Sequence, residues 1–93
     1  MGELTEEQIK DLYEKAKLIE LKPVISSNIG GIGYDTENKL LKVAFKTKTG
    51  SSIYLYEGVE QEVYESLYQS ESVGKKLSES IIKQKDKYRY IKL

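Results

Sequence analysis

The chain has 93 residues, enough for one domain, and its 39% hydrophobic and 32% charged residues are typical of a globular fold and argue against disorder. It contains no histidine and no cysteine, which removes the commonest general base, the commonest metal ligand and any disulfide framework. The composition therefore favours a domain that binds a partner, uses no metal or cofactor, and is not an enzyme.

No apolar run approaches the roughly 20 residues that a transmembrane helix needs. The first residues, Met1-Gly2-Glu3-Leu4, lack the basic and then apolar pattern of a signal peptide. We therefore expect a cytoplasmic protein that does not associate with membranes.

A helix is predicted from Thr5 to about Glu20. Thr5 and Gln8 have the spacing of a capping box, and apolar residues follow at helical intervals. Lys22-Pro23 should end this helix, because a residue before proline avoids the α region. The expected organisation is an N-terminal helix at 1–22 and a domain at 23–93, which together form one compact unit.

The middle of the chain is typical of an antiparallel sheet. A short extended segment at 24–26 precedes the stretch 28–35, where three glycines favour a strand with a bulge or a turn. Alternating apolar residues then predict strands at 41–46 and 52–56, with Gly50 in the hairpin loop between them.

Beyond Gly58 the apolar spacing becomes helical. It predicts helices at 60–69 and at about 75–83, and residues 88–93 alternate again as a final strand. The expected fold class is α+β, with a small antiparallel sheet packed against two to three helices and an extra N-terminal helix.

Three motifs that often carry chemistry are weak here. The glycines at 30–33 lack the lysine and the hydroxyl residue of a phosphate-binding loop and lead into a strand. The carboxylates of Glu57, Glu60, Glu62 and Glu65 are close in sequence, but their spacing is not that of a calcium-binding loop. Glu62 and Glu65 share a helix face that is typical of a solvated one. The serines have no histidine to activate them.

Charge is distributed in blocks along the chain. Residues 57–73 hold five acids and no base, whereas residues 74–93 hold seven bases and two acids. A neutral chain can still present one basic face, although separate solvated faces are the competing interpretation. The candidate nucleic-acid-binding residues are Lys75, Lys76, Lys83, Lys85, Lys87, Tyr88, Arg89, Tyr90 and Lys92.

Tyrosine is the most unusual feature of the composition, with eight copies beside one phenylalanine and no tryptophan. Tyr54 and Tyr56 share one face of a predicted strand, and Tyr88 and Tyr90 repeat that spacing. Aromatic rings among lysines hold single-stranded nucleic acid by stacking and phosphate pairing. The alternative, which a small core favours, is that these rings pack inside with their hydroxyls reaching water.

Several of these positions together resemble the KTSC domain family, which is named after a C-terminal extension of some lysyl-tRNA synthetases. The resemblance covers about residues 24–93. It rests on Val24, Ser26, Ser27, Ile29, Ile32-Gly33-Tyr34-Asp35, Leu41, Val43, Phe45, Gly50, Tyr54, Tyr56, Val59, Val63-Tyr64, Leu67, Ser72, Gly74, Ile81, Tyr88 and Tyr90.

The chain departs from the family pattern at a few positions. Glu60 replaces a usual proline, and Leu77-Ser78 replaces a usual phenylalanine and asparagine. The hairpin between Phe45 and Tyr54 is slightly longer than usual, and the N-terminal helix lies outside the pattern. The resemblance implies a compact α+β domain, found mostly as short bacterial and phage proteins. Its association with synthetases suggests nucleic-acid binding by analogy.

We therefore expect a non-enzymatic binding module, with RNA or DNA as its first candidate partner. A protein-interaction or inhibitory module of bacterial or phage origin is the alternative, using the acidic stretch 57–71 and the N-terminal helix against a host protein. A binder or sponge for small nucleotides is the third, with a pocket between protomers. The small size of the domain makes a homo-oligomer plausible.

Overall fold

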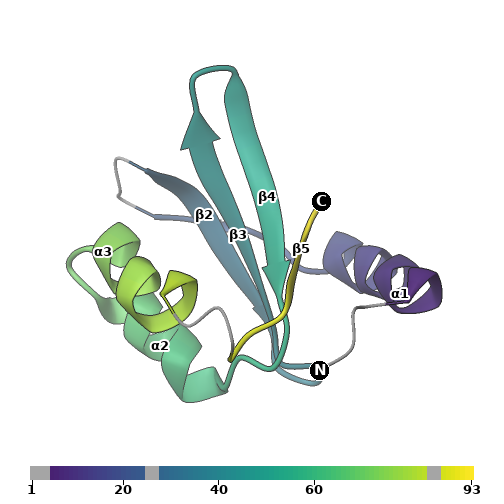
Figure 1. Ribbon diagram of the computed structural model, residues 1–93. Helices are drawn as coiled ribbons and strands as arrows, with labels where there is room; N and C mark the ends of the chain where they lie inside the picture. The colour runs from purple at the N-terminus through teal and green to yellow at the C-terminus, as the bar shows by residue number, and fades with distance from the viewer. Residues whose placement is uncertain (1–4, 25–27, 84–86) are drawn as a thin grey trace.

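A five-stranded antiparallel sheet forms the centre of the computed structural model, which describes residues 5–24, 28–83 and 87–93 (Figure 1). The strands follow one another across the sheet in chain order. They are β1 (Lys22–Pro23), β2 (Ile29–Asp35), β3 (Leu40–Thr47), β4 (Gly50–Tyr56) and β5 (Tyr90–Lys92). This arrangement confirms the predicted α+β class.

Helices lie on both faces of the sheet (Figure 1). One face is covered by α2 (Gln61–Gln69), α3 (Val73–Leu77) and η1 (Ser78–Ile82). The other face packs against α1 (Glu6–Lys17), the predicted N-terminal helix. The sheet therefore has two differently covered sides.

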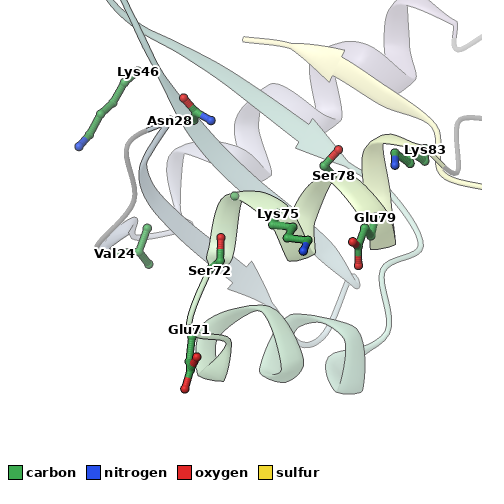
Figure 2. Close-up of a pocket in the computed structure, with 10 residues that line it drawn as sticks. Val24, Asn28, Lys46, Glu71, Ser72, Lys75, Ser78, Glu79 and Lys83 are labelled. Atoms are coloured by element: carbon green, nitrogen blue, oxygen red, sulfur yellow. The ribbon is translucent and has the colours of Figure 1, made fainter.

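The third predicted helix is two elements in the structure. It begins at Val73, two residues before the expected start, and changes after Leu77 from an α-helix into a π-helical turn. The Lys83 amide donates to the Ser78 carbonyl oxygen at 2.9 Å, which is the i to i+5 spacing of such a turn. Figure 2 shows η1 continuing α3, with Ser78 and Lys83 at its ends.

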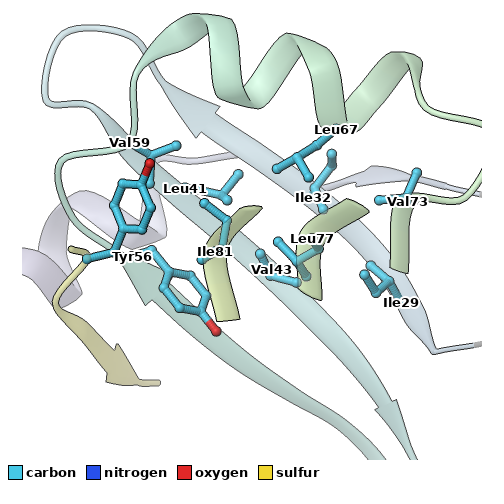
Figure 3. Packing of buried hydrophobic residues seen from close by; sticks show 11 residues of the cluster. Ile29, Ile32, Leu41, Val43, Tyr56, Val59, Leu67, Val73, Leu77 and Ile81 are labelled. Atoms are coloured by element: carbon cyan, nitrogen blue, oxygen red, sulfur yellow. The ribbon is translucent and has the colours of Figure 1, made fainter. Parts of the chain in front are cut away.

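The larger core lies between the sheet and the helices α2, α3 and η1 (Figure 3). Leu41 and Val43 contribute to it from β3, because alternate strand residues share a face. The opposite set of side chains, Leu40, Leu55 and Ile91, forms a second cluster with α1. Both faces of the sheet are thus apolar where helices cover them.

The capping box predicted at the start of α1 is confirmed. The Gln8 amide donates to Thr5 Oγ1 at 3.2 Å, and the Thr5 amide donates to Gln8 Oε1 at 2.9 Å. The helix ends at Lys17, three residues before the expected Glu20. The Ala16 carbonyl group in its last turn and the Ile19 carbonyl group just beyond the helix both accept hydrogen bonds from Lys42 of β3.

The glycine-rich stretch forms β2, and the predicted bulge is confirmed by a register shift between Ile29 and Gly31. Gly33 lies directly beneath the segment that follows α1. A Cβ atom there would overlap the Glu20 carbonyl oxygen and the Ile19 side chain. Glycine at this position therefore lets α1 pack on the sheet.

Three strand boundaries differ from the sequence predictions. The first strand is Lys22–Pro23 instead of 24–26, since an edge strand tolerates proline; residues 25 and 26 lie outside the described part. Thr47 pairs with Gly50, so the hairpin loop is tighter than predicted. The final strand is limited to Tyr90–Lys92, because it pairs only with the end of β4.

Candidate binding groove

An aromatic groove of about 360 Å³ runs between η1 and the strands β3, β4 and β5. It lies on the face of the sheet that carries the larger core. Its lining residues are Phe45, Thr47, Ser52, Tyr54, Tyr56, Ile81, Tyr88 and Tyr90. Strand alternation explains the six lining residues on β3, β4 and β5, since every second strand residue points to the same side. Ile81 comes from η1, and Tyr88 precedes β5.

Four of these rings form a continuous row across three strands. Phe45 and Tyr54 meet edge to face with ring centres 5.5 Å apart. Tyr90 lies 6.0 Å from Tyr54 and 5.6 Å from Tyr56 between ring centres. These are ordinary distances for aromatic pairs, so the rings hold one another in place.

The row passes from buried rings to an exposed one. Tyr56 and Tyr88 are buried, Tyr54 and Phe45 are half-buried, and Tyr90 is 52% exposed. A ring that is half open to solvent and anchored on two neighbours is a preformed surface on which a flat molecule can stack. Tyr90 is therefore the most accessible aromatic side chain of the groove.

Burial sets the ionisation behaviour of the inner wall. It raises the pKa of the Tyr56 hydroxyl to about 12, and the nearby Tyr90 and Tyr54 hydroxyls add to the effect. The Tyr56 hydroxyl thus stays protonated at neutral pH. It can donate a hydrogen bond in the groove, but it cannot act there as a base.

Two lysines of the predicted basic surface lie by these rings. Lys92 is exposed and lies on β5 with Tyr90. In the register of β4 and β5 it is directly opposite Tyr54. Lys87 Nζ lies 5.5 Å from the centre of the Tyr88 ring. These cations stand beside an apolar aromatic surface, which is the combination that binds an anionic chain of flat bases.

The described residues among the other predicted site residues are either buried in the groove floor or lie away from the groove. Arg89 directly precedes Tyr90, so its side chain points to the opposite face of the sheet, the face that α1 covers. There its Nε lies 3.1 Å from Glu57 Oε2. Tyr88 is buried among the core residues, although it lines the groove floor. Lys76 is half-buried on α3, and Lys85 lies outside the described residues.

Lys75 and Lys83 line a separate cavity of about 790 Å³ next to α3 and η1 (Figure 2). The predicted basic surface is therefore divided. Some of its cations flank the aromatic groove and others lie beyond η1. The sequence alone could not divide them, because it does not show the π-helical turn that stands between the two hollows.

Phe45, Thr47, Ser52 and Ile81 were not among the predicted site residues. Phe45 is opposite Ser52 in the register of β3 and β4, and this places its ring diagonally next to Tyr54. Phe45 continues the series of every second residue that begins with Leu41 and Val43, and this spacing could have placed it on the same face of β3. The position of Ile81 depends on helix packing, which strand periodicity does not report.

A second tyrosine group lies away from the groove, between β2 and α2. Tyr34 stacks on Tyr64 with ring centres 4.9 Å apart and planes 11° apart, and the Tyr34 hydroxyl donates to the Val59 carbonyl oxygen. Tyr68 continues this group and is 47% exposed, with Lys22 Nζ 5.9 Å from its ring centre. This group packs α2 against the sheet.

The described residues contain neither a candidate metal cluster nor a candidate membrane-spanning helix. Among residues 5–24, 28–83 and 87–93, no group of three or more acidic, histidine or cysteine side chains could hold a metal ion. In the same part of the chain, no helix is both long and apolar enough to cross a lipid bilayer.

Comparison with known proteins agrees with the fold. A crystal structure of a KTSC domain protein from Yersinia pestis superposes with a TM-score of 0.67 at 31% identity, covering 81% of this chain and 97% of the other. A protein of Tsukamurella paurometabola is 40% identical over 55 residues, which is 59% of this chain and 78% of the relative. A protein of Stutzerimonas stutzeri is 34% identical over 65 residues, covering 70% and 84%.

The fold and the groove together define a small α+β domain with an aromatic surface at one end of its sheet. The family model described as the KTSC domain matches residues 25–90. The chain belongs to the KTSC domain family, and the resemblance seen in the sequence is confirmed. Helix α1 lies outside the matched residues.

Proposed function

We propose that this domain is a non-catalytic module that binds single-stranded RNA or DNA in the aromatic groove. The observation that carries the proposal is the position of Tyr90. Its ring is 52% exposed, is held by Tyr54 and Tyr56, and shares a short strand with Lys92. Stacking and phosphate pairing are thus available side by side.

The physical basis is a match between the groove and an unpaired base. A base that stacks on an aromatic side chain contributes about 1–3 kcal/mol of binding free energy, largely regardless of its identity. The phosphates attached to that base carry negative charge, which Lys92 and Lys87 attract. A duplex hides the faces of its bases, so the groove favours single strands.

The chemistry of the groove supports binding without catalysis. The chain has no histidine or cysteine, and burial raises the pKa of the Tyr56 hydroxyl in the groove to about 12, which keeps it neutral. A general base needs a pKa near the working pH. The groove is therefore suited to holding a flat ligand rather than transforming it.

Fluorescence anisotropy with labelled single-stranded oligonucleotides tests the proposal. The Tyr90→Ala variant should bind about 5- to 150-fold more weakly, which corresponds to the loss of one stacked base. Tyr68→Ala is the matched control, because Tyr68 is similarly exposed but lies on α2. Equal binding by wild type and both variants, or an equal loss in both variants, would refute the proposal.

Salt dependence provides an independent readout. If about three phosphates are paired, affinity should fall about 20-fold between 50 and 200 mM salt. Lys92→Gln should reduce that dependence, whereas Lys10→Gln on α1 should not.

If single nucleotides raise the unfolding temperature as strongly as oligonucleotides do, the groove is instead a site for small nucleotides.

A protein contact is the second candidate function, and one exposed side chain favours it. Leu18, at the end of α1, is 87% exposed and lines a depression of about 610 Å³ with Glu37 and Glu65. Deleting residues 1–20 would not test this contact specifically, because the deletion would also expose the apolar cluster that packs beneath α1. Leu18→Asp should abolish partner capture if this surface is used, while Tyr90→Ala should leave it intact.

A further inference from the structure

The π-helical turn η1 stands between two hollows of the protein. Ile81 lines the aromatic groove on one side of it, and Ser78 lines the larger cavity of about 790 Å³ on the other. Lys83 directly follows η1 and lines the same cavity as Ser78. A nucleic-acid strand that leaves the groove by crossing η1 would therefore meet Lys83.

The cavity beyond η1 offers groups that suit phosphate oxygens. Figure 2 shows Lys75 and Lys83 along the α3–η1 wall, with the Ser72 and Ser78 hydroxyls on the same wall. Lys46 lies across the cavity on β3. Ammonium and hydroxyl groups are the usual side-chain partners of a nucleic-acid backbone.

Two carboxylates also line this cavity. Glu71 lies at the end near the connection between α2 and α3, away from Lys83, and Glu79 projects from η1 (Figure 2). The lining therefore holds three lysines and two glutamates. This mixed charge is unsuited to an isolated, highly charged anion, and is better suited to one or two backbone phosphates of a strand already held elsewhere.

We propose that the cavity beyond η1 is a second subsite for the same nucleic-acid strand. Bases stack in the aromatic groove, the backbone crosses η1, and the following phosphates pair with Lys83 and Lys75. This proposal rests on the proposed function, because the cavity receives a strand that the groove positions. It assigns a role to two basic residues that do not lie at the groove.

The dimensions of a helix set the length of strand that such binding needs. A helical element with its side chains is about 10–12 Å wide. Stacked nucleotides advance about 3.4 Å each along one strand, so about three nucleotides are needed to pass η1. A trinucleotide should thus occupy the groove alone, whereas a strand of about nine nucleotides should reach both subsites.

The test compares labelled single-stranded oligomers of three and nine nucleotides on the full chain. The variant Lys75→Gln/Lys83→Gln removes the cations of the second subsite. The matched control Lys10→Gln/Lys17→Gln removes two exposed lysines of α1, on the other face of the sheet. Longer strands also gain affinity because they offer more binding registers, but that gain is common to all three proteins.

The second subsite predicts a selective loss. The Lys75/Lys83 variant should bind the nine-nucleotide strand about tenfold more weakly than wild type, with a salt slope smaller by about 1.4 for two lost phosphate contacts. Its affinity for the trinucleotide should be unchanged, and the control variant should match wild type with both strands. Thermal unfolding checks that each variant is folded.

The outcomes separate the two proposals. If both strands bind through Tyr90 but the Lys75/Lys83 variant matches wild type, the second subsite is wrong and the proposed function stands. An equal loss for the short and long strands also overturns the second subsite. If neither strand binds wild type, the proposed function fails and the second subsite fails with it.

Discussion

The ammonium group of Lys42 lies 3.0 Å from the carbonyl oxygen of Ala16, and it donates a hydrogen bond from β3 to the end of α1. The same group also donates to the Ile19 carbonyl oxygen at 3.2 Å. The last carbonyl groups of a helix have no partner within it and carry partial negative charge. Lys42 therefore fixes the end of α1 to the sheet.

Replacing Lys42 tests this attachment. Lys42→Met keeps the aliphatic stem but removes both hydrogen bonds, so it should lower the free energy of unfolding by about 1–3 kcal/mol. Urea denaturation followed by circular dichroism measures the loss. Lys48→Met, in the exposed hairpin turn, is the control and should change stability by less than about 0.5 kcal/mol. Equal stability of the two variants would contradict the role of Lys42.

Two glycines of β2 should respond differently to alanine. A Cβ at Gly33 would overlap the backbone at Glu20, so Gly33→Ala should destabilise the fold by about 1–3 kcal/mol. A Cβ at Gly30 would meet its nearest atom, the Ala44 carbonyl oxygen, at 3.7 Å, and Gly30→Ala should be nearly neutral. Melting temperatures of the two variants compare these positions, and similar losses would mean that α1 does not rest on Gly33.

Helix α1 also supports the strand that carries Tyr90. The Tyr13 hydroxyl donates to the Lys92 carbonyl oxygen at 2.9 Å, and Ile91 packs in the cluster beneath α1. Tyr13→Phe should cost about 0.5–1 kcal/mol, because one partly exposed hydrogen bond is lost. Hydrogen exchange should rise most at the Leu93 amide, which bonds to Ile53. Unchanged exchange at Leu93, measured against amides of β3, would count against this support.

Alkaline pH should weaken the fold through its buried tyrosines. Burial raises the pKa of Tyr56 to about 12, and it also raises the pKa values of Tyr34 and Tyr64. In the unfolded chain these hydroxyls ionise near pH 10. The unfolded state therefore binds fewer protons between pH 10 and 12, and stability should decline as the pH rises through that window.

Tyr56→Phe separates the contribution of Tyr56 from those of the other tyrosines. The variant should lose less stability than wild type between pH 10 and 12, and its tyrosinate absorbance should lack the component that titrates near pH 12. Denaturation at a series of pH values provides the measurement. Identical pH profiles for the two proteins would mean that Tyr56 does not ionise as its burial requires.

Local sequence signals predicted most of the secondary structure. Thr5 and Gln8 specify the start of α1 through hydrogen bonds between near neighbours, and the bulge of β2 follows from its glycines. The alternation at 41–46 placed β3 within a residue of its ends. These features depend on residues a few positions apart, which is why the sequence alone is sufficient for them.

The candidate site was predicted only in part, because it depends on contacts between distant segments. Arg89 and Tyr90 are neighbours in sequence but take opposite faces of the sheet, and Arg89 pairs with Glu57. Tyr88 is in the core although it lies outside the regular strand. The apolar spacing of Leu77 and Ile81 fits an α-helix, so it could not indicate the π-helical turn.

The short antiparallel course of β5 has a practical consequence for measuring binding. The Leu93 amide donates to the Ile53 carbonyl oxygen at 2.8 Å, so the chain leaves β5 running along β4 toward Ser52 (Figure 1). A dye coupled after Leu93 would sit beside the groove and report its occupancy by a change in emission. A dye on the solvent face of α1 would sit behind the sheet and serve as a reference signal.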